Sequence, residues 1–160
     1  MVAGINRRAA VANPESSLTI AIVVMKGSEH LASDKIVMRL GGIYALEGVM
    51  NTSERPEQYR GPVLEALCAF VREYTIGKTV FEKPDIDIQA ALTVIGRRKG
   101  PELPDLAKAN IPGANLSGAN LRSADLTGVN LRGANPSVAY LIGAGCPCFG
   151  DGPEPENCSA

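Results

Sequence analysis

Residues 104–143 repeat a pattern every five residues, and this period limits the fold more than any other feature of the chain. Written in blocks, the segment reads PDLAK, ANIPG, ANLSG, ANLRS, ADLTG, VNLRG, ANPSV, AYLIG. A small residue opens most blocks, a polar residue, usually Asn, follows, and an apolar residue, usually Leu, stands third. Neither an α-helix nor a β-strand has a five-residue period. The chain must therefore turn at a fixed step, which is typical of a solenoid.

These blocks resemble the pentapeptide-repeat family, whose motif is A(N/D)LXX. The resemblance implies a right-handed quadrilateral β-helix, with one pentad per side and four pentads per coil. In that fold the first and third residues of a pentad point inward, and each residue stacks on the equivalent residue of the next coil, about 4.8 Å away. The implied core of the β-helix comprises Leu106, Ile111, Leu116, Leu121, Leu126, Leu131, Leu141, Ala114, Ala119 and Ala124. Pro136 stands where another Leu is expected, and it has no N–H for a ladder.

The segment before the repeats has the periodicity of helices. Ser33 is a good N-cap for a helix with an apolar face over 36–50. A second apolar face spans 63–74, where Pro62 suits the first turn. Either Asp85 or Asp87 can cap a third helix that runs through residue 95.

Two stretches of this segment leave more than one interpretation. Residues 18–32 alternate like a strand at Leu18, Ile20 and Ile22, while later positions suit a helix. Gly41 and Gly42 each weaken a helix by about 1 kcal/mol relative to Ala, which is tolerable if another helix packs closely there.

The order of the segments extends the resemblance. VMRLGGIYALEGV followed by VLEALCAFVRE resembles a HEAT-like helix pair, and DIQAALTVIGRR then precedes the repeats. This order is similar to that of a bacterial group of pentapeptide-repeat proteins, over residues 24–143. Many of that group have membrane-spanning helices upstream. The longest apolar run here, residues 18–25, is far short of the ~20 residues that a span needs, so we expect no membrane span in this chain.

We therefore predict an α+β chain, in which a small α-helical, HEAT-like bundle precedes a short right-handed quadrilateral β-helix of about two coils. The predicted organisation is a disordered start at 1–17, a helical domain at 18–100, the repeat at 101–145 and a disordered tail at 146–160. Two coils are too few for a free-standing repeat stack. We expect the third helix, or the bundle behind it, to cap the lower end.

Charge and cysteine content restrict the function further. The formal net charge is −1, which argues against binding nucleic acid through bulk charge. The four cysteines, without a convincing secretory signal, favour free thiols in a reducing compartment, so we expect the cytoplasm. The pattern Cys146-Pro147-Cys148 with Cys158 suggests a metal site, but its spacing is poor for zinc, and we expect no metal there.

The other reactive side chains have ordinary structural interpretations. Cys68 falls on an apolar helix face and is expected to be a buried thiol. His30 is the single histidine and is expected at the surface. Glu47 and Glu65 lie on different predicted helices, so nothing pairs them as an acid and a base. The run at 97–99 is basic and suits the solvated C-terminal end of a helix.

We therefore expect no catalytic residue, no cofactor and no enzymatic activity. The interpretation that we favour is a protein–protein interaction scaffold with an unknown protein partner. The alternative, implied by the family resemblance, is a DNA-mimicking inhibitor or protector of a topoisomerase such as gyrase. Such mimics are long and acidic, whereas residues 101–145 are expected to make only two coils. Their acidic and basic side chains are equal in number: Glu102, Asp105 and Asp125 against Lys108, Arg122 and Arg132.

Overall fold

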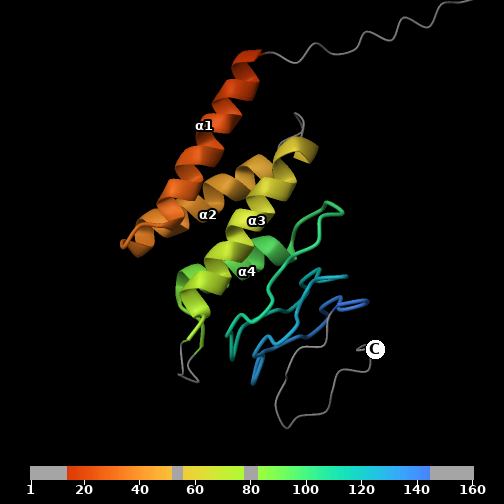
Figure 1. Cartoon of the computed structure of the whole chain (residues 1–160). Coiled ribbons are helices and arrows are strands. Elements are labelled where there is room, and N and C mark those ends of the chain that lie inside the picture. The colour runs from red at the N-terminus through yellow and green to blue at the C-terminus, as the bar shows by residue number, and fades with distance from the viewer. Residues whose placement is uncertain (1–13, 52–55, 78–82, 145–160) are drawn as a thin grey trace, which may run out of the picture.

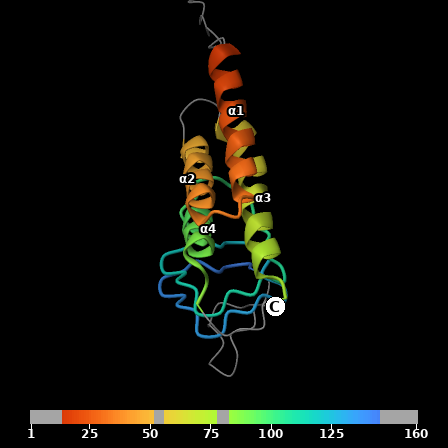
Figure 2. The ribbon, with the colours of Figure 1, turned by 90° about the vertical axis from the view of Figure 1, so that its left-hand side faces the viewer.

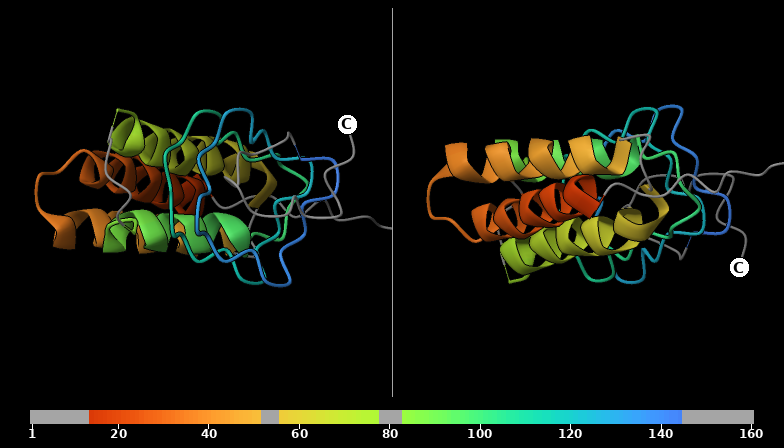
Figure 3. Two further views of the ribbon diagram at one scale, coloured as in Figure 1. Left: turned by 90° about the horizontal axis from the view of Figure 1, so that it is seen from below. Right: turned by 90° about the horizontal axis from the view of Figure 1, so that it is seen from above.

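The computed structural model of the chain describes residues 14–51, 56–77 and 83–144 (Figure 1). Its helices are α1 (Pro14–Leu31), α2 (Ile36–Asn51), α3 (Pro56–Thr75) and α4 (Ile86–Gly96). The repeat follows α4 and winds into two coils at one end of the helices, with α1 farthest from them (Figures 1 and 2). Viewed from below and above, the two coils lie side by side as near-parallel loops (Figure 3).

The first two helices pack against each other at a glycine contact. A Cβ at Gly42 would lie 2.7 Å from the carbonyl oxygen of Gly27 and 2.8 Å from Cβ of His30. A Cβ at Gly27 would lie 2.8 Å from Cγ of Leu46. Residues 18–31 are helical rather than extended, and the expected close helix contact at Gly42 is confirmed. Gly41 is exposed and has nothing within 4 Å of an added Cβ, so it plays no part in the contact.

Two predicted helix boundaries are wrong. Helix α1 begins at Pro14, inside the predicted disordered start; Glu15 suits the positive end of the helix dipole there. Residues 1–13 lie outside the described residues. Helix α3 begins at Pro56 rather than near Pro62, which lies inside the helix. Because Pro62 is still close to the N-terminus, its missing N–H removes only one early helical hydrogen bond.

Helix α4 is the central element, since it contacts both α2 and α3 and also meets the coils. Most of its residues are buried: Asp87, Ile88, Ala90, Ala91, Leu92, Val94, Ile95 and Gly96. A helix that is apolar on most sides belongs in the interior. This explains why the shortest of the four helices joins the two parts of the molecule.

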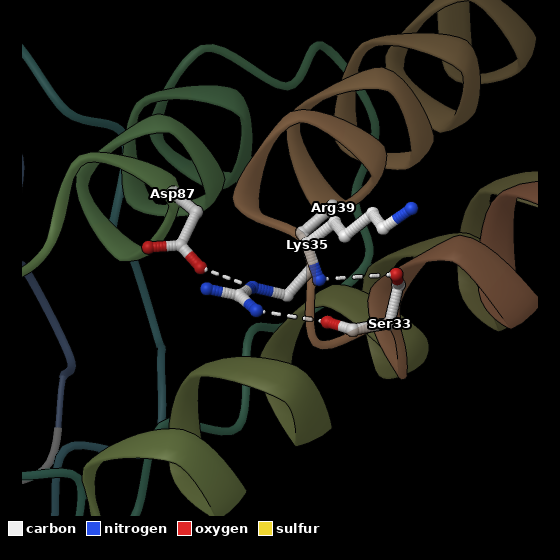
Figure 4. A network of polar contacts seen from close by, with 4 residues as sticks. All are labelled: Ser33, Lys35, Arg39 and Asp87. Carbon is white, nitrogen blue, oxygen red and sulfur yellow. Dashed lines mark hydrogen bonds and ion pairs between the residues drawn. The ribbon is translucent and has the colours of Figure 1, made fainter.

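One buried ion pair ties α2 to α4 (Figure 4). The side chain of Asp87 is 1% exposed, and its Oδ2 lies 2.5 Å from Nε of Arg39. The same guanidinium donates through Nη1 to the carbonyl oxygen of Ser33 at 2.8 Å and lies 5.3 Å from the ring centre of Tyr74. A buried carboxylate is tolerated when it is paired in this way.

Each pentad of the repeat forms one tight turn. The N–H of the opening residue bonds to the C=O of the preceding third residue, as Ala109 does to Leu106 at 3.0 Å. The fifth residue has positive φ, between 51° and 71° along the repeat, as in a type II turn. Glycine usually occupies this position because it has no Cβ to clash. Val138, with a φ of 58°, is the exception whose β-branched side chain fits worst.

The prediction of a right-handed β-helix is wrong for the residues that the structure describes, which contain four helices and no strand. Neighbouring coils are joined instead by four isolated parallel bridges, Asp105 to Asp125, Asn110 to Asn130, Asn115 to Asn135 and Asn120 to Tyr140. The physical reason is the turn in every pentad, because it leaves too few extended residues on each side for a strand.

The bridges confirm the expected register, in which each residue meets the one twenty positions later. The ten residues expected to form the core of the repeat are all buried. The missing N–H of Pro136 does not disturb the pairing between the coils. There the bond runs from the N–H of Leu116 to the C=O of Asn135, at 2.8 Å, and no bond between the coils requires an N–H at position 136.

Candidate interaction surface

The helical part provides hydrogen-bond partners for the backbone of the first coil on each of its sides. On the first side, the amide of Asp105 is the backbone hydrogen-bond partner of the Cys68 thiol, whose pKa is raised from 9.0 to about 11 mainly by burial. Nη1 of Arg72 donates to the carbonyl oxygen of Asp105 at 2.9 Å and also pairs with its carboxylate. On the second side, the amide of Asn110 donates to Oγ1 of Thr75 at 3.2 Å. Helix α3 thus supplies partners for two sides.

Helix α4 and the residues after it cover the other two sides. The side-chain amide of Gln89 accepts from the N–H of Asn115 at 2.9 Å and donates to its C=O at 2.8 Å, as a neighbouring coil would. The N–H of Asn120 donates to the carbonyl oxygen of Gly96 at 2.7 Å, and Nη1 of Arg98 donates to the carbonyl oxygen of Asn120. The second-position amide of every pentad in the first coil therefore has a partner in the helical part.

This cap makes the two parts one continuous body. A buried or half-buried backbone amide without a partner is costly, and these amides would otherwise need a preceding coil. Burial lowers the pKa of the Arg98 guanidinium, which remains charged because its ordinary value is so high. The predicted capping of the lower end is thus seen in the contacts between α4 and the first coil.

A groove opens beside this junction, between α3 and the start of the repeat. Its volume is about 480 Å³. Apolar side chains of Pro62, Leu64 and Leu103 line it together with the carboxylates of Glu65, Glu102 and Asp105. Arg72 is the one cation among its lining residues, and it is already paired with Asp105. The groove is therefore part apolar and negatively charged.

The outer face of the repeat is held by its own side chains. The Asp or Asn at the second position of a pentad accepts the N–H two residues later, as Asp125 does from Thr127 at 2.9 Å. Nδ2 of Asn130 donates to Oδ1 of Asn110 in the coil below at 2.7 Å. These Asx turns explain the polar second position, because its side chain stabilises the turn. Recognition of a ligand is not needed to explain it.

Two of the predicted solvent-exposed charges have specific partners. Arg97 forms an ion pair with Glu47 through two nitrogens, of which Nη2 lies 2.6 Å from Oε2, and this hydrogen bond raises the pKa of Arg97. Arg98 is buried in the cap, whereas Arg97 and Lys99 are exposed, so the expectation of a solvated basic run is wrong for Arg98. The sequence offers no signal that separates these three residues.

The remaining candidate residues are not brought together. His30 is half-buried at the end of α1, and Cys68 is buried, as expected, on α3. Glu65 is exposed at the groove, on a different helix from Glu47. Within the described ranges, no group of three His, Cys, Asp or Glu side chains could hold a metal ion. Cys146, Cys148 and Cys158 lie outside the described residues.

Sequence reasoning missed the cap residues Thr75, Gln89 and Arg98. A Thr or Gln on a helix has no special pattern, and its role depends on which backbone groups the fold places opposite it. Among the helices that the structure describes, none is long and apolar enough to cross a bilayer.

Comparison with known families identifies the repeat. The model of the family described as "Pentapeptide repeats (8 copies)" matches residues 105–135, so these residues are pentapeptide repeats. They follow a helical segment, as the resemblance implied. The family is generally a protein-interaction fold. Searches of curated proteins and of solved structures return no match.

Proposed function

We propose that this protein is a non-enzymatic scaffold of the cytoplasm that binds a partner protein in the groove between α3 and the first pentad. The observation that supports this most strongly is the composition of the groove, which combines apolar side chains with more carboxylates than cations. Such a mixture suits a protein segment better than a small apolar ligand.

The charge of the groove selects the kind of segment. In the part of the chain that the structure describes, the carboxylate of Glu65 takes part in no ion pair, and the carboxylate of Glu102 accepts no hydrogen bond. A Lys or Arg side chain of the partner would meet these carboxylates with its charged end. Its aliphatic stem would pack on Leu64 and Leu103, because long basic side chains bury their stems and keep the charge at a polar edge.

The cap supports the same interpretation. Cys68 and Arg72 lie in the groove and also bind the backbone of Asp105, so the groove is held between two fixed elements. A preorganised site loses less entropy when a partner binds. The proposed partner site is therefore built into the junction of the helices and the repeat.

The topoisomerase-directed alternative has less support. The charges of residues 101–145 balance, and the described residues form two coils, whereas competition for a DNA site requires an extended acidic surface. We expect that purified protein neither inhibits DNA supercoiling by gyrase nor protects the enzyme from a quinolone. Inhibition at low micromolar protein would place this alternative first.

A peptide-display selection on the full chain tests the proposed site. We expect enrichment of peptides with a Lys or Arg beside an apolar residue. The substitutions Glu65→Lys and Glu102→Lys should each weaken binding of a selected peptide at least about tenfold, since they place like charges in contact. NMR shifts on peptide addition should centre on the backbone amides of Leu64 and Leu103.

The matched control is Glu73→Lys, a charge reversal on the exposed side of α3 outside the groove. It should leave peptide affinity within about twofold of the parent. If all three variants bind equally well, or if the enriched peptides carry no basic residue, the groove is not the partner site.

A further inference from the structure

Helix α1 has two apolar faces, and only one of them is covered. Its inner face packs on α2, with Gly27 and Leu31 buried. On the opposite side four apolar residues follow one another at helical spacing and are exposed: Leu18 (64%), Ala21, Ile22 (41%) and Met25 (55%). We call these four residues the outer stripe. An isolated surface helix normally has a polar outer face, so this stripe requires a partner.

The residues beside the outer stripe argue against a membrane surface as that partner. Glu15 and Glu29 lie near its two ends, and Lys26 is the one cation on this part of the helix. Amphipathic helices that bind anionic lipid are rich in Lys and Arg next to their apolar face. The outer stripe therefore fits a protein surface.

The outer stripe is complementary to itself when two copies run antiparallel. If the pair is centred between Ala21 and Ile22, Leu18 of one copy meets Met25 of the other at each end. In the middle, the small Ala21 of one copy lies opposite the larger Ile22 of the other, which is how side chains of paired helices interlock.

The charged side chains of α1 also favour the antiparallel orientation. Glu15 and Lys26 lie on the same flank of the stripe by helical geometry, and in an antiparallel pair equal flanks face each other. Lys26 of one copy then lies near Glu15 of the other. Glu29 of one copy lies beside the first turn of α1 of the other copy, where the helix dipole favours a carboxylate. In a parallel pair opposite flanks would face each other instead, so Lys26 of one copy would not meet Glu15 of the other.

We propose that the outer stripe of α1 binds the same stripe of a second copy of this chain in an antiparallel pair. The helix of 18 residues is roughly 27 Å long, and a contact one helix wide is smaller than a standard protein interface. The dimer is therefore weak, and it forms at high protein concentration. It leaves the groove at α3 free, so dimerisation and binding of a partner segment are independent.

Sedimentation equilibrium on the full chain, from about 10 µM to about 1 mM, tests for the dimer in the range expected for a small interface. Ile22→Asp should raise the dissociation constant at least about tenfold, because the Asp must lose its water in the pair. The control is Val37→Asp, which places the same charge on an exposed residue of α2. It should dimerise like the parent, and melting curves should show that both variants are folded.

A charge swap tests the direction of the pair. Lys26→Glu alone and Glu15→Lys alone should each weaken the dimer, and the two changes together should restore it. A parallel pair predicts no such rescue, since Lys26 and Glu15 would then lie on flanks that do not face each other. A chain that stays monomeric at 1 mM, a dimer that Ile22→Asp does not weaken, or a double variant without rescue would each overturn the assignment.

Discussion

The tightest contact between the helices and the repeat is at Gly96, so the substitution Gly96→Ala probes the cap directly. A Cβ at Gly96 would lie 2.7 Å from Cβ of Ala119 and 3.1 Å from its Cα. Neither atom belongs to a flexible side chain, so α4 or the first coil must move. Overpacking of this kind costs about 1–3 kcal/mol. The movement would also lengthen the hydrogen bond from Asn120 N–H to the Gly96 carbonyl, now 2.7 Å.

A second glycine provides a control of the same chemistry. Gly48 lies inside α2, and an added Cβ there would have nothing within 4 Å. In an exposed helical position Ala is more favourable than Gly by about 0.5–1 kcal/mol. Gly48→Ala should therefore stabilise the protein, while Gly96→Ala destabilises it by about 1–2 kcal/mol once its own gain in helix propensity is subtracted.

Urea unfolding followed by circular dichroism measures both free energies, and hydrogen exchange locates the effect. In Gly96→Ala the amides of Asn115 and Asn120 should exchange faster, because both bond to the α4 region. Exchange in the α1–α2 contact should not change. If Gly96→Ala is as stable as the parent and Asn120 stays protected, the close approach of α4 to the first coil is not what joins the two parts.

Four further substitutions or conditions test other parts of the structure. Leu121→Asp, which places a charge in the buried centre of a coil, should cost several kcal/mol in a thermal or urea melt. Val138→Gly should stabilise by up to about 1 kcal/mol, since it removes a β-branched residue from positive φ; an unchanged melting point would contradict this. Arg39→Met should destabilise by about 3–5 kcal/mol because it leaves Asp87 buried without its cation, and Arg39→Met with Asp87→Leu should recover most of the loss. Because burial raises the pKa of Cys68 from 9.0 to about 11, the thiol ionises at lower pH in the unfolded chain than in the folded protein. The free energy of unfolding should therefore be unchanged by this thiol below pH 9 and should fall between pH 9 and pH 11. Cys68→Ala should remove this part of the pH dependence.

The turn chemistry of the repeat was visible in the sequence, and the form of its pairing was not. Ala at the first position, Asn or Asp at the second and Gly at the fifth each have a local reason, namely burial, an Asx turn and positive φ. The period of five and the register of twenty follow from them. The number of extended residues between turns depends on backbone geometry. Too few remain for a strand, so single bridges join the coils where strands were predicted.

The candidate interaction surface was the part least accessible to sequence reasoning. Glu65 read as an ordinary helix carboxylate and Cys68 as a buried thiol. Their neighbourhood in one groove arises because α3 passes the start of the repeat, about forty residues later in the chain. No periodicity links positions so far apart, since the contact depends on the packing of α4 between them.

By itself the sequence determined the local geometry: where the chain turns, which side chains face inward in the coils, and that Gly42 permits a close helix contact. These properties depend on steric and hydrophobic preferences of residues near one another in the chain. The tertiary structure alone decided that Gln89 completes one side of a coil, that Arg98 closes another, and that Arg97 pairs with Glu47. A polar side chain on a helix has many possible partners, and only the packing of α3 and α4 on the first coil selects one of them.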